Sequence, residues 1–185
     1  MAIWAADAPT VKSGPEVGKD LPGPFHPYNV TGKEASNFHC VVCTNGLEPV
    51  VLVFVRGSAF SDDLKKFLGQ LDEAIAKDPK ARISAAAIFL FDDLKSVVTD
   101  DVNRTKYAEM VEKLKNDAKL TQLVLCLDSA DGPKGYGINA DAKVTVLVSS
   151  RLQVVANFAY ADEKSIDTTA IVAAVKEKLG TPAKK

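Results

Sequence analysis

Three residues within one short stretch have side chains that could do chemistry: His39, Cys40 and Cys43, in the order His-Cys-Val-Val-Cys. Two cysteines separated by two residues can form a disulfide, exchange thiols with disulfides, or bind a metal ion. A protonated His39 beside Cys40 would favour the thiolate, which is the nucleophilic form of the thiol. The first interpretation is therefore a reversible dithiol at Cys40 and Cys43, with His39 as its modulator.

Two other interpretations of this pair stay open. Closing so small a ring gains only roughly 2 kcal/mol of loop entropy, which makes stapling a weak reason for the pair, but a static disulfide that fixes a turn uses the same residues. With His39 and His26, the cysteines also offer a Cys₂His₂ set for zinc or copper. The spacing departs from zinc-finger patterns, and a His next to a ligand Cys rarely reaches the same ion. We therefore expect no metal and no cofactor.

The third cysteine, Cys126, lies in the apolar run 123–127, which is typical of a buried strand. We expect it to behave as a small, inert core side chain. Three cysteines are too few for a disulfide framework, so only Cys40 and Cys43 are close enough in sequence to act together.

Composition indicates one soluble globular domain. The chain has 185 residues, of which 46% are hydrophobic and 25% charged, so it can bury a full core without disulfide staples. A formal net charge of −1 gives no reason to expect nucleic acid or anionic lipid as a partner. The longest apolar stretch, 83–91, contains Ser84 and is too short to span a bilayer.

The element that must position the cysteine pair is the run 50–56, which follows it closely. Six consecutive apolar residues, four of them Val, predict a strand buried on both faces. Ser61 then resembles an N-cap, with Asp62 and Asp63 in the first turn of an amphipathic helix that stops before Pro79. The pair therefore precedes a strand–helix unit.

Similar patterns predict the rest of the chain. We expect further strands at 83–91, 122–128, 144–148 and 153–160, and helices at 103–118 and from Ser165 or Asp167 to Leu179. The short gap between the last two strands indicates an antiparallel hairpin. The order is thus strand, helix, strand, helix, strand, hairpin, helix.

Several phrases in this order resemble the redoxin and peroxiredoxin branch of the thioredoxin-like superfamily, over about residues 17–180. They are the VGxxxP-like start Val17-Gly-Lys-Asp-Leu-Pro22, the central strand 49–54, the segment ending in Tyr136-Gly-Ile138, and the PTxxL-like strand 143–148. The resemblance implies an α/β fold, a thioredoxin-like three-layer sandwich with a central mixed sheet and helices on both faces.

The sequence departs from that superfamily at its active site. There, the reactive cysteines follow the central strand, at the start of the next helix, where the helix N-terminus lowers the thiol pKa. The matching positions here, 56–63, contain no cysteine, and Val144 stands where the superfamily has a cis-proline. The resemblance therefore implies a displaced Cys-x-x-Cys and no ordinary thioredoxin or peroxiredoxin catalysis at the usual site.

We divide the chain into a loop-rich N-terminal arm at 1–37, a thioredoxin-like domain at 38–180 and a disordered tail at 181–185. The apolar start at 1–8 is similar to a signal-peptide remnant, which favours an extracytoplasmic location, periplasmic or secreted. The predicted function is thiol–disulfide redox chemistry on a protein thiol or disulfide partner. The rival is a non-catalytic binding or scaffold module that keeps Cys40–Cys43 as a structural disulfide.

Overall fold

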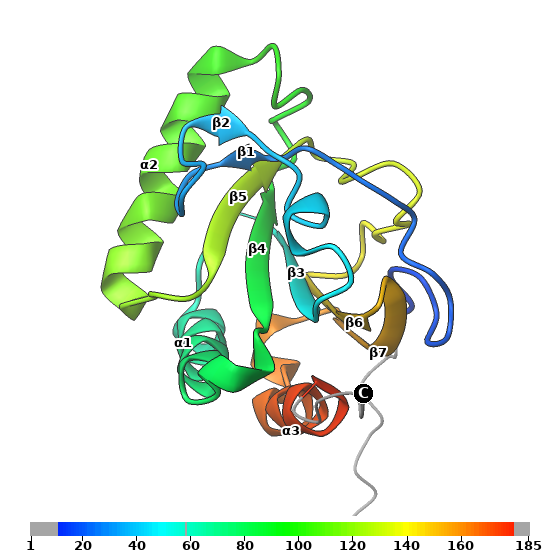
Figure 1. Ribbon diagram of the computed structural model, residues 1–185. Helices are drawn as coiled ribbons and strands as arrows, with labels where there is room; N and C mark the ends of the chain where they lie inside the picture. Colours follow the sequence, from blue (N-terminus) through cyan, green and yellow to red (C-terminus); the bar gives the residue numbers. More distant parts are fainter. Residues whose placement is uncertain (1–10, 58, 180–185) are drawn as a thin grey trace, which may run out of the picture.

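One mixed sheet forms the centre of the computed structural model, which describes residues 11–57 and 59–179. Within these ranges the strand order is β2-β1-β5-β4-β3-β6-β7 (Figure 1). The strands are β1 (Tyr28–Asn29), β2 (Asn37–Phe38), β3 (Val50–Arg56), β4 (Ser84–Leu90), β5 (Val124–Asp128), β6 (Val144–Ser150) and β7 (Gln153–Tyr160). The strand expected after the cysteine pair is therefore β3, and it lies between β4 and β6.

Strand β3 is buried along its whole length, as its apolar run predicts. It pairs in parallel with β4, which pairs in parallel with β5, whereas β6 and β7 form the predicted antiparallel hairpin. Val51 and Val53 belong to one buried cluster and Leu52 and Phe54 to another. The two clusters correspond to the two faces of the sheet, because side chains alternate along a strand.

The helices are α1 (Asp62–Ala76), α2 (Asp101–Ala118) and α3 (Thr168–Leu179). The predicted N-cap of α1 is confirmed, because the Ser61 hydroxyl accepts a hydrogen bond from the Leu64 amide at 3.1 Å. At α3 the capping side chain is Asp167, which accepts from the Ala170 amide at 2.8 Å. Short 3₁₀ turns occur at η1 (Cys43–Asn45), η2 (Pro79–Ala81) and η3 (Glu163–Ser165).

The thioredoxin-like α/β fold and its central mixed sheet are confirmed, but the layers differ in one respect from the expected helices on both faces. The buried side chains of α1, α2 and α3 all join the cluster of Val51 and Val53. The connections β3–α1–β4 and β4–α2–β5 step in the same direction across the sheet. Because such parallel crossovers are right-handed, they place α1 and α2 on one face.

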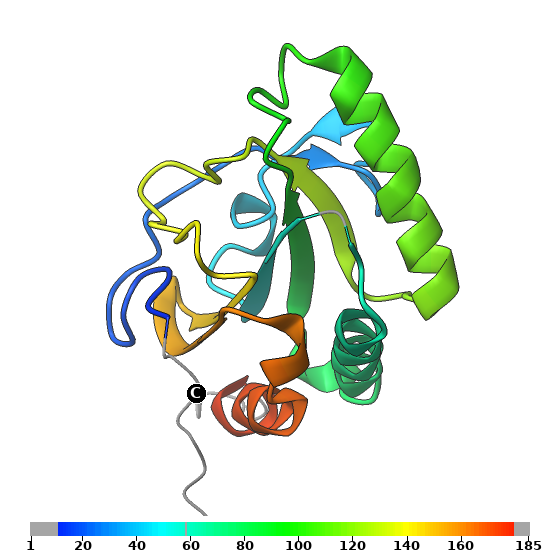
Figure 2. The same cartoon turned by 180° about the vertical axis from the view of Figure 1, so that it is seen from behind.

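The other face is covered by irregular chain instead of helices. Leu21, Phe25, the cysteine loop and Tyr136 pack there against Leu52 and Phe54. In Figures 1 and 2 the first part of the arm (blue) and the connection 129–142 (yellow) lie away from the three helices. The cysteine pair is therefore part of the layer that replaces the second set of helices.

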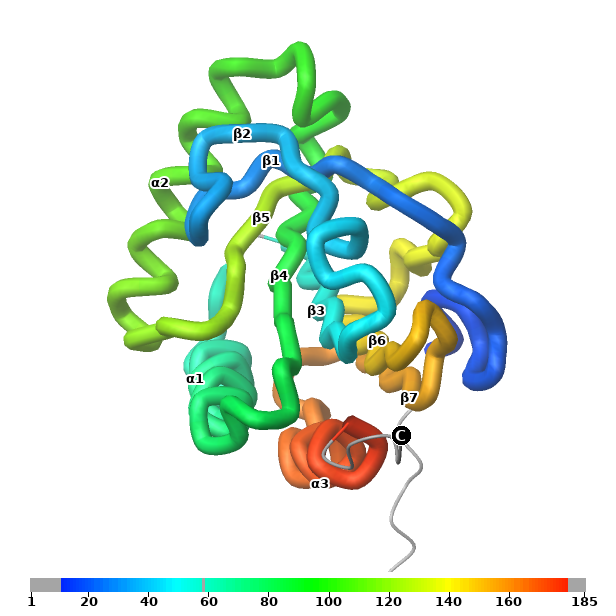
Figure 3. Tube along the Cα trace, viewed as in Figure 1, coloured from blue at the N-terminus to red at the C-terminus, as the bar shows by residue number. Residues whose placement is uncertain are grey.

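The described part of the N-terminal arm is held to the sheet. The Val154 amide donates to the Lys19 carbonyl at 2.8 Å, and the Asn157 side chain donates to the Ser13 carbonyl at 2.9 Å. Figure 3 shows the trace passing β7, crossing to β1 and β2, and then entering the loop that leads into β3. The predicted remnant at 1–8 and tail at 181–185 lie outside the described residues. Among the helices in the described ranges, none has the length and apolar character to cross a membrane.

Candidate functional site

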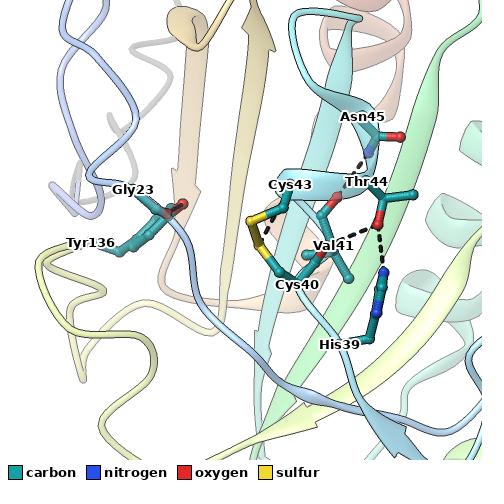
Figure 4. Close-up of a disulfide and its surroundings, with 8 residues drawn as sticks. All are labelled: Gly23, His39, Cys40, Val41, Cys43, Thr44, Asn45 and Tyr136. Carbon is teal, nitrogen blue, oxygen red and sulfur yellow. Dashed lines mark hydrogen bonds between the residues drawn. A yellow bond between two sulfur atoms is a disulfide. The ribbon is translucent and has the colours of Figure 1, made fainter.

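The candidate site is the loop 39–45, which carries Cys40 and Cys43 and precedes β3. The two cysteines form a disulfide with their Cα atoms 5.3 Å apart, and η1 begins at Cys43 (Figure 4). The loop lies at the amino end of β3. The sequence therefore placed the pair correctly before the strand.

The two sulfur-bearing residues have different surroundings. Cys40 is 4% exposed and belongs to the buried cluster of Phe25 and Tyr136, whereas Cys43 is exposed. The Cys43 amide donates a hydrogen bond to the Cys40 sulfur at 3.1 Å. A reagent or partner thiol arriving from solvent can therefore reach Cys43 more readily than Cys40.

Two residues that the sequence analysis did not single out hold the loop in shape. The Thr44 hydroxyl donates to the Cys40 carbonyl at 3.0 Å, and the Asn45 side chain donates to the Val41 carbonyl at 2.8 Å. Each bond joins residues four positions apart. Thr and Asn side chains commonly form such local bonds to the backbone, so their spacing from Cys40 and Val41 was the available signal.

His39 points toward Thr44 and not toward the disulfide (Figure 4). Its Nε2 atom lies 2.7 Å from the Thr44 hydroxyl oxygen. The Thr44 hydroxyl has one hydrogen and donates it to the Cys40 carbonyl, so its oxygen acts as the acceptor toward His39. His39 Nε2 is therefore the donor in this contact. The structure thus links His39 to the cysteine pair through Thr44, and the predicted action of His39 on a thiolate remains a prediction.

The metal alternative finds no ligand set in the part of the chain that the structure describes. No group of three or more His, Cys, Asp or Glu side chains gathers there in a metal-binding arrangement. The Cys40 and Cys43 sulfurs are bonded to each other, so neither is a free thiolate ligand.

Two buried groups nearby are structural. Cys126 is fully buried, as expected; burial raises the pKa of its thiol, which contacts the Asn29 side-chain oxygen at 3.2 Å. Tyr136 donates its hydroxyl to the Gly23 carbonyl at 2.8 Å, and burial raises its pKa to about 12. Both side chains are therefore uncharged at neutral pH, and Tyr136 ties the arm to the face on which Cys40 lies.

The position where thioredoxin-like proteins usually carry their cysteines is at the other end of β3. Here Arg56 is 8% exposed and donates to the Ala130 carbonyl at 2.7 Å. The Ser61 amide at the start of α1 donates to the Glu163 carboxylate at 3.2 Å. No cis peptide bond occurs within 11–57 and 59–179, which include Val144. At the usual position of the reactive cysteines, this chain thus has a buried arginine and a helix start whose amide is bonded to a carboxylate.

Comparison with known proteins supports the fold. No family model matches the sequence, and no curated protein matches it. A protein from Chlorobium tepidum, provisionally assigned as the thiol:disulfide interchange protein DsbE, is 15% identical with a TM-score of 0.60; the match covers 92% of this chain and 100% of that one. A provisionally assigned protein disulfide isomerase from Bacteroides thetaiotaomicron has a TM-score of 0.63 at 15% identity, covering 92% and 96%.

A bacterioferritin comigratory protein from Xanthomonas campestris, described for its alkyl peroxide reduction activity, has a TM-score of 0.54 at 11% identity, covering 86% of this chain and 94% of that one. The similarity thus extends over nearly the whole of each chain. At these identities it establishes a thioredoxin-like fold. This chain therefore has a thioredoxin-like fold, and its Cys-x-x-Cys before β3 forms a disulfide.

Proposed function

We propose that this thioredoxin-like protein exchanges thiols with disulfides through Cys40 and Cys43, with a protein dithiol or disulfide as its partner. The observation that supports this most is the asymmetry of the pair, in which Cys43 is exposed and Cys40 is buried. Exchange needs one accessible sulfur to be attacked and a second sulfur to leave. The pair offers one of each.

In the oxidising direction, a thiolate of the partner attacks the Cys43 sulfur. The Cys40–Cys43 bond breaks, a mixed disulfide forms between Cys43 and the partner, and Cys40 leaves with the electron pair. The Cys43 amide, which donates to the Cys40 sulfur, stabilises that leaving thiolate. A second partner thiolate then attacks the mixed disulfide and releases Cys43, so that two partner thiols become a disulfide and the Cys40–Cys43 pair becomes a dithiol. The reverse sequence reduces a partner disulfide.

His39 is assigned a positioning part in this proposal. It donates to Thr44, whose hydroxyl holds the Cys40 carbonyl, so His39 acts on the pair through the shape of the loop. If His39 also favours a thiolate in the reduced pair, His39→Ala makes the reduction potential of Cys40–Cys43 more negative. An unchanged potential would confine His39 to holding the loop.

A working disulfide also favours an oxidising compartment, and we therefore propose an extracytoplasmic location, periplasmic or secreted. Recovery of the full-length chain with cytoplasmic markers in a cell fractionation would contradict this location.

One observation favours a second function. Cys40 is buried beside Phe25 and Tyr136, and the loop is closed by Thr44 and Asn45 as well as by the disulfide. These are also the features of a structural clip in a non-catalytic binding module. A clip predicts a disulfide that resists the glutathione pool and whose loss leaves partner binding intact.

The test is the reduction potential of Cys40–Cys43, measured by thiol trapping in glutathione and dithiothreitol buffers, in a Cys126→Ser background that removes the buried third thiol. A value between roughly −120 and −270 mV is expected for exchange. A value below about −300 mV would support the clip instead.

Single variants sharpen this test. We expect the Cys40→Ser variant, which leaves Cys43 free and exposed, to react with an aromatic disulfide reagent at least about tenfold faster than Cys43→Ser, which leaves a buried Cys40 thiol. Equal rates would contradict the assigned order of attack. Circular dichroism of both variants checks that each remains folded.

A further inference from the structure

A partly open hollow lies between the cysteine loop and the sheet. It has a volume of about 220 Å³, and Val50, Ala86 and Val124 from three adjacent strands form its floor. Val41, Thr44 and Asn45 from the cysteine loop form one wall. The cavity is therefore built partly from the residues within and directly after the Cys-x-x-Cys.

The hollow exists because the side chains beneath the loop are small and the loop cannot collapse onto them. Ser84 and Ala86 of β4 lie opposite Val50 and Leu52 in the parallel register, and neither side chain is large enough to fill the space above it. The hydrogen bonds of the Thr44 and Asn45 side chains to the backbone of the loop hold the loop in a shape that leaves space between it and the sheet.

The size and the lining select the kind of ligand. An apolar cavity of about 150 Å³ is enough to hold benzene, whereas pockets for drug-sized molecules occupy about 300–1,000 Å³. The lining surface is mostly apolar, and two exposed residues that also line it, Lys33 and Glu34, carry opposite charges. These features fit one compact, uncharged apolar group, such as a single aromatic ring or a branched aliphatic chain. The cavity is too small for a nucleotide or flavin.

The disulfide and the cavity share one piece of backbone. Figure 4 shows the two sulfur atoms on one side of the loop and the side chains of Thr44 and Asn45 on the other. Val41 lies within the ring that the disulfide closes between Cys40 and Cys43, and Thr44 is the residue directly after this ring. Reduction to two thiols removes a covalent restraint from the cavity wall, so the wall loses preorganisation.

We propose that this cavity binds a compact, uncharged apolar group and that the oxidation state of Cys40–Cys43 sets its affinity. The disulfide form binds more tightly because its wall is already ordered. By linkage, the ligand makes the disulfide harder to reduce by the same factor, and a tenfold difference in affinity corresponds to about 30 mV. The inference requires only that the disulfide can be reduced, so it stands apart from catalysis of exchange.

The experiment is an NMR titration of the full chain, which is labelled with ¹⁵N. Indole is the ligand that is added. In the oxidised protein, indole is expected to shift the amide signals of Val41, Thr44 and Ala86 in a saturable manner. After reduction with dithiothreitol, the affinity is expected to fall at least tenfold. Benzoate, a charged ring of similar size, is expected to bind more weakly than indole.

Variants of the cavity floor complete the test. Ala86→Leu fills the hollow and is expected to abolish indole binding, as is the milder Ser84→Val if Ala86→Leu fails to fold. Ala173→Leu, at an exposed position on α3, is the matched control and keeps binding intact. The apolar group could belong to a side chain of another protein or to a free small molecule, and a blocked tripeptide with a central Phe distinguishes the two. Binding of the tripeptide points to a protein side chain, and binding of indole alone points to a free molecule.

Several results would overturn the inference. Unshifted cavity amides in the oxidised protein would exclude the site, and equal affinity in the two oxidation states would exclude the redox control. Benzoate binding as tightly as indole would exclude the assigned ligand class.

Discussion

The two ends of β3 carry different chemistry. At its amino end, the loop 39–45 holds a disulfide with one exposed and one buried cysteine. At its carboxyl end, where the thioredoxin plan usually places the reactive thiol, the start of α1 is occupied by a hydroxyl and carboxylates. Ser61 caps the helix, and Glu163 accepts from the Ser61 amide.

This difference explains how the fold can persist while the sulfur chemistry moves. A helix N-terminus favours a negative charge nearby, and that preference can stabilise either a thiolate or a fixed carboxylate. Here Asp62, Asp63 and Glu163 supply fixed carboxylates at the N-terminus of α1. On this comparison the carboxyl end of β3 contributes to stability, and the amino end carries the proposed exchange.

The largest effect on stability is expected from Arg56→Met. This change removes the donor to the buried Ala130 carbonyl, and an unpaired buried acceptor costs about 1–3 kcal/mol. Urea unfolding measures the loss, and Arg56→Lys, which keeps a donor, is the matched variant with a smaller expected loss. The reduction potential of Cys40–Cys43 is expected to stay unchanged. A shifted potential would show that the carboxyl end of β3 influences the disulfide at its amino end.

A smaller effect is expected from Ser61→Ala. Loss of the N-cap hydroxyl that accepts from the Leu64 amide costs about 1 kcal/mol. Thermal or urea unfolding measures it, and Ser61→Thr keeps the hydroxyl as a control. An equal loss in both variants would show that the cap is not the cause.

The smallest effect concerns Asp128, at the carboxyl end of β5. Burial raises the pKa of this carboxyl, so the folded protein holds the proton to a higher pH than the unfolded chain does. Its contribution to stability is therefore present at low pH and is lost as pH rises through the raised pKa.

Asp128→Asn is neutral at every pH and is expected to remove this part of the decline in stability. Urea unfolding from about pH 4 to 7 measures it, with Asp131→Asn, the same change at a nearby exposed position, as the matched control. A decline of the same slope in Asp128→Asn would assign the pH dependence to other groups.

Much of the fold followed from local pattern. The apolar run at 50–56 predicted a strand buried on both faces, and Ser61 with the acidic first turn predicted where α1 begins. The short gap before Gln153 predicted the β6–β7 hairpin. These features depend on near neighbours in the chain, such as alternation, capping and turn length, so the sequence contains them directly.

Contacts between distant segments decided the rest. That all three described helices share one face depends on the strand order β5-β4-β3, and local periodicity does not contain that order. Burial of Cys40 depends on Phe25 and Tyr136, which come from the arm and from the connection before β6.

For the candidate site, the sequence by itself determined that a close cysteine pair, with His39 beside it, comes before the central strand and that the usual positions at 56–63 lack cysteine. Only the tertiary structure decided that Cys43 faces solvent, that His39 turns to Thr44, and that the loop stands over a hollow above Ala86. The physical reason is that exposure, side-chain direction and empty volume are set by what packs against a residue from elsewhere in the chain, and spacing along the sequence does not specify those neighbours.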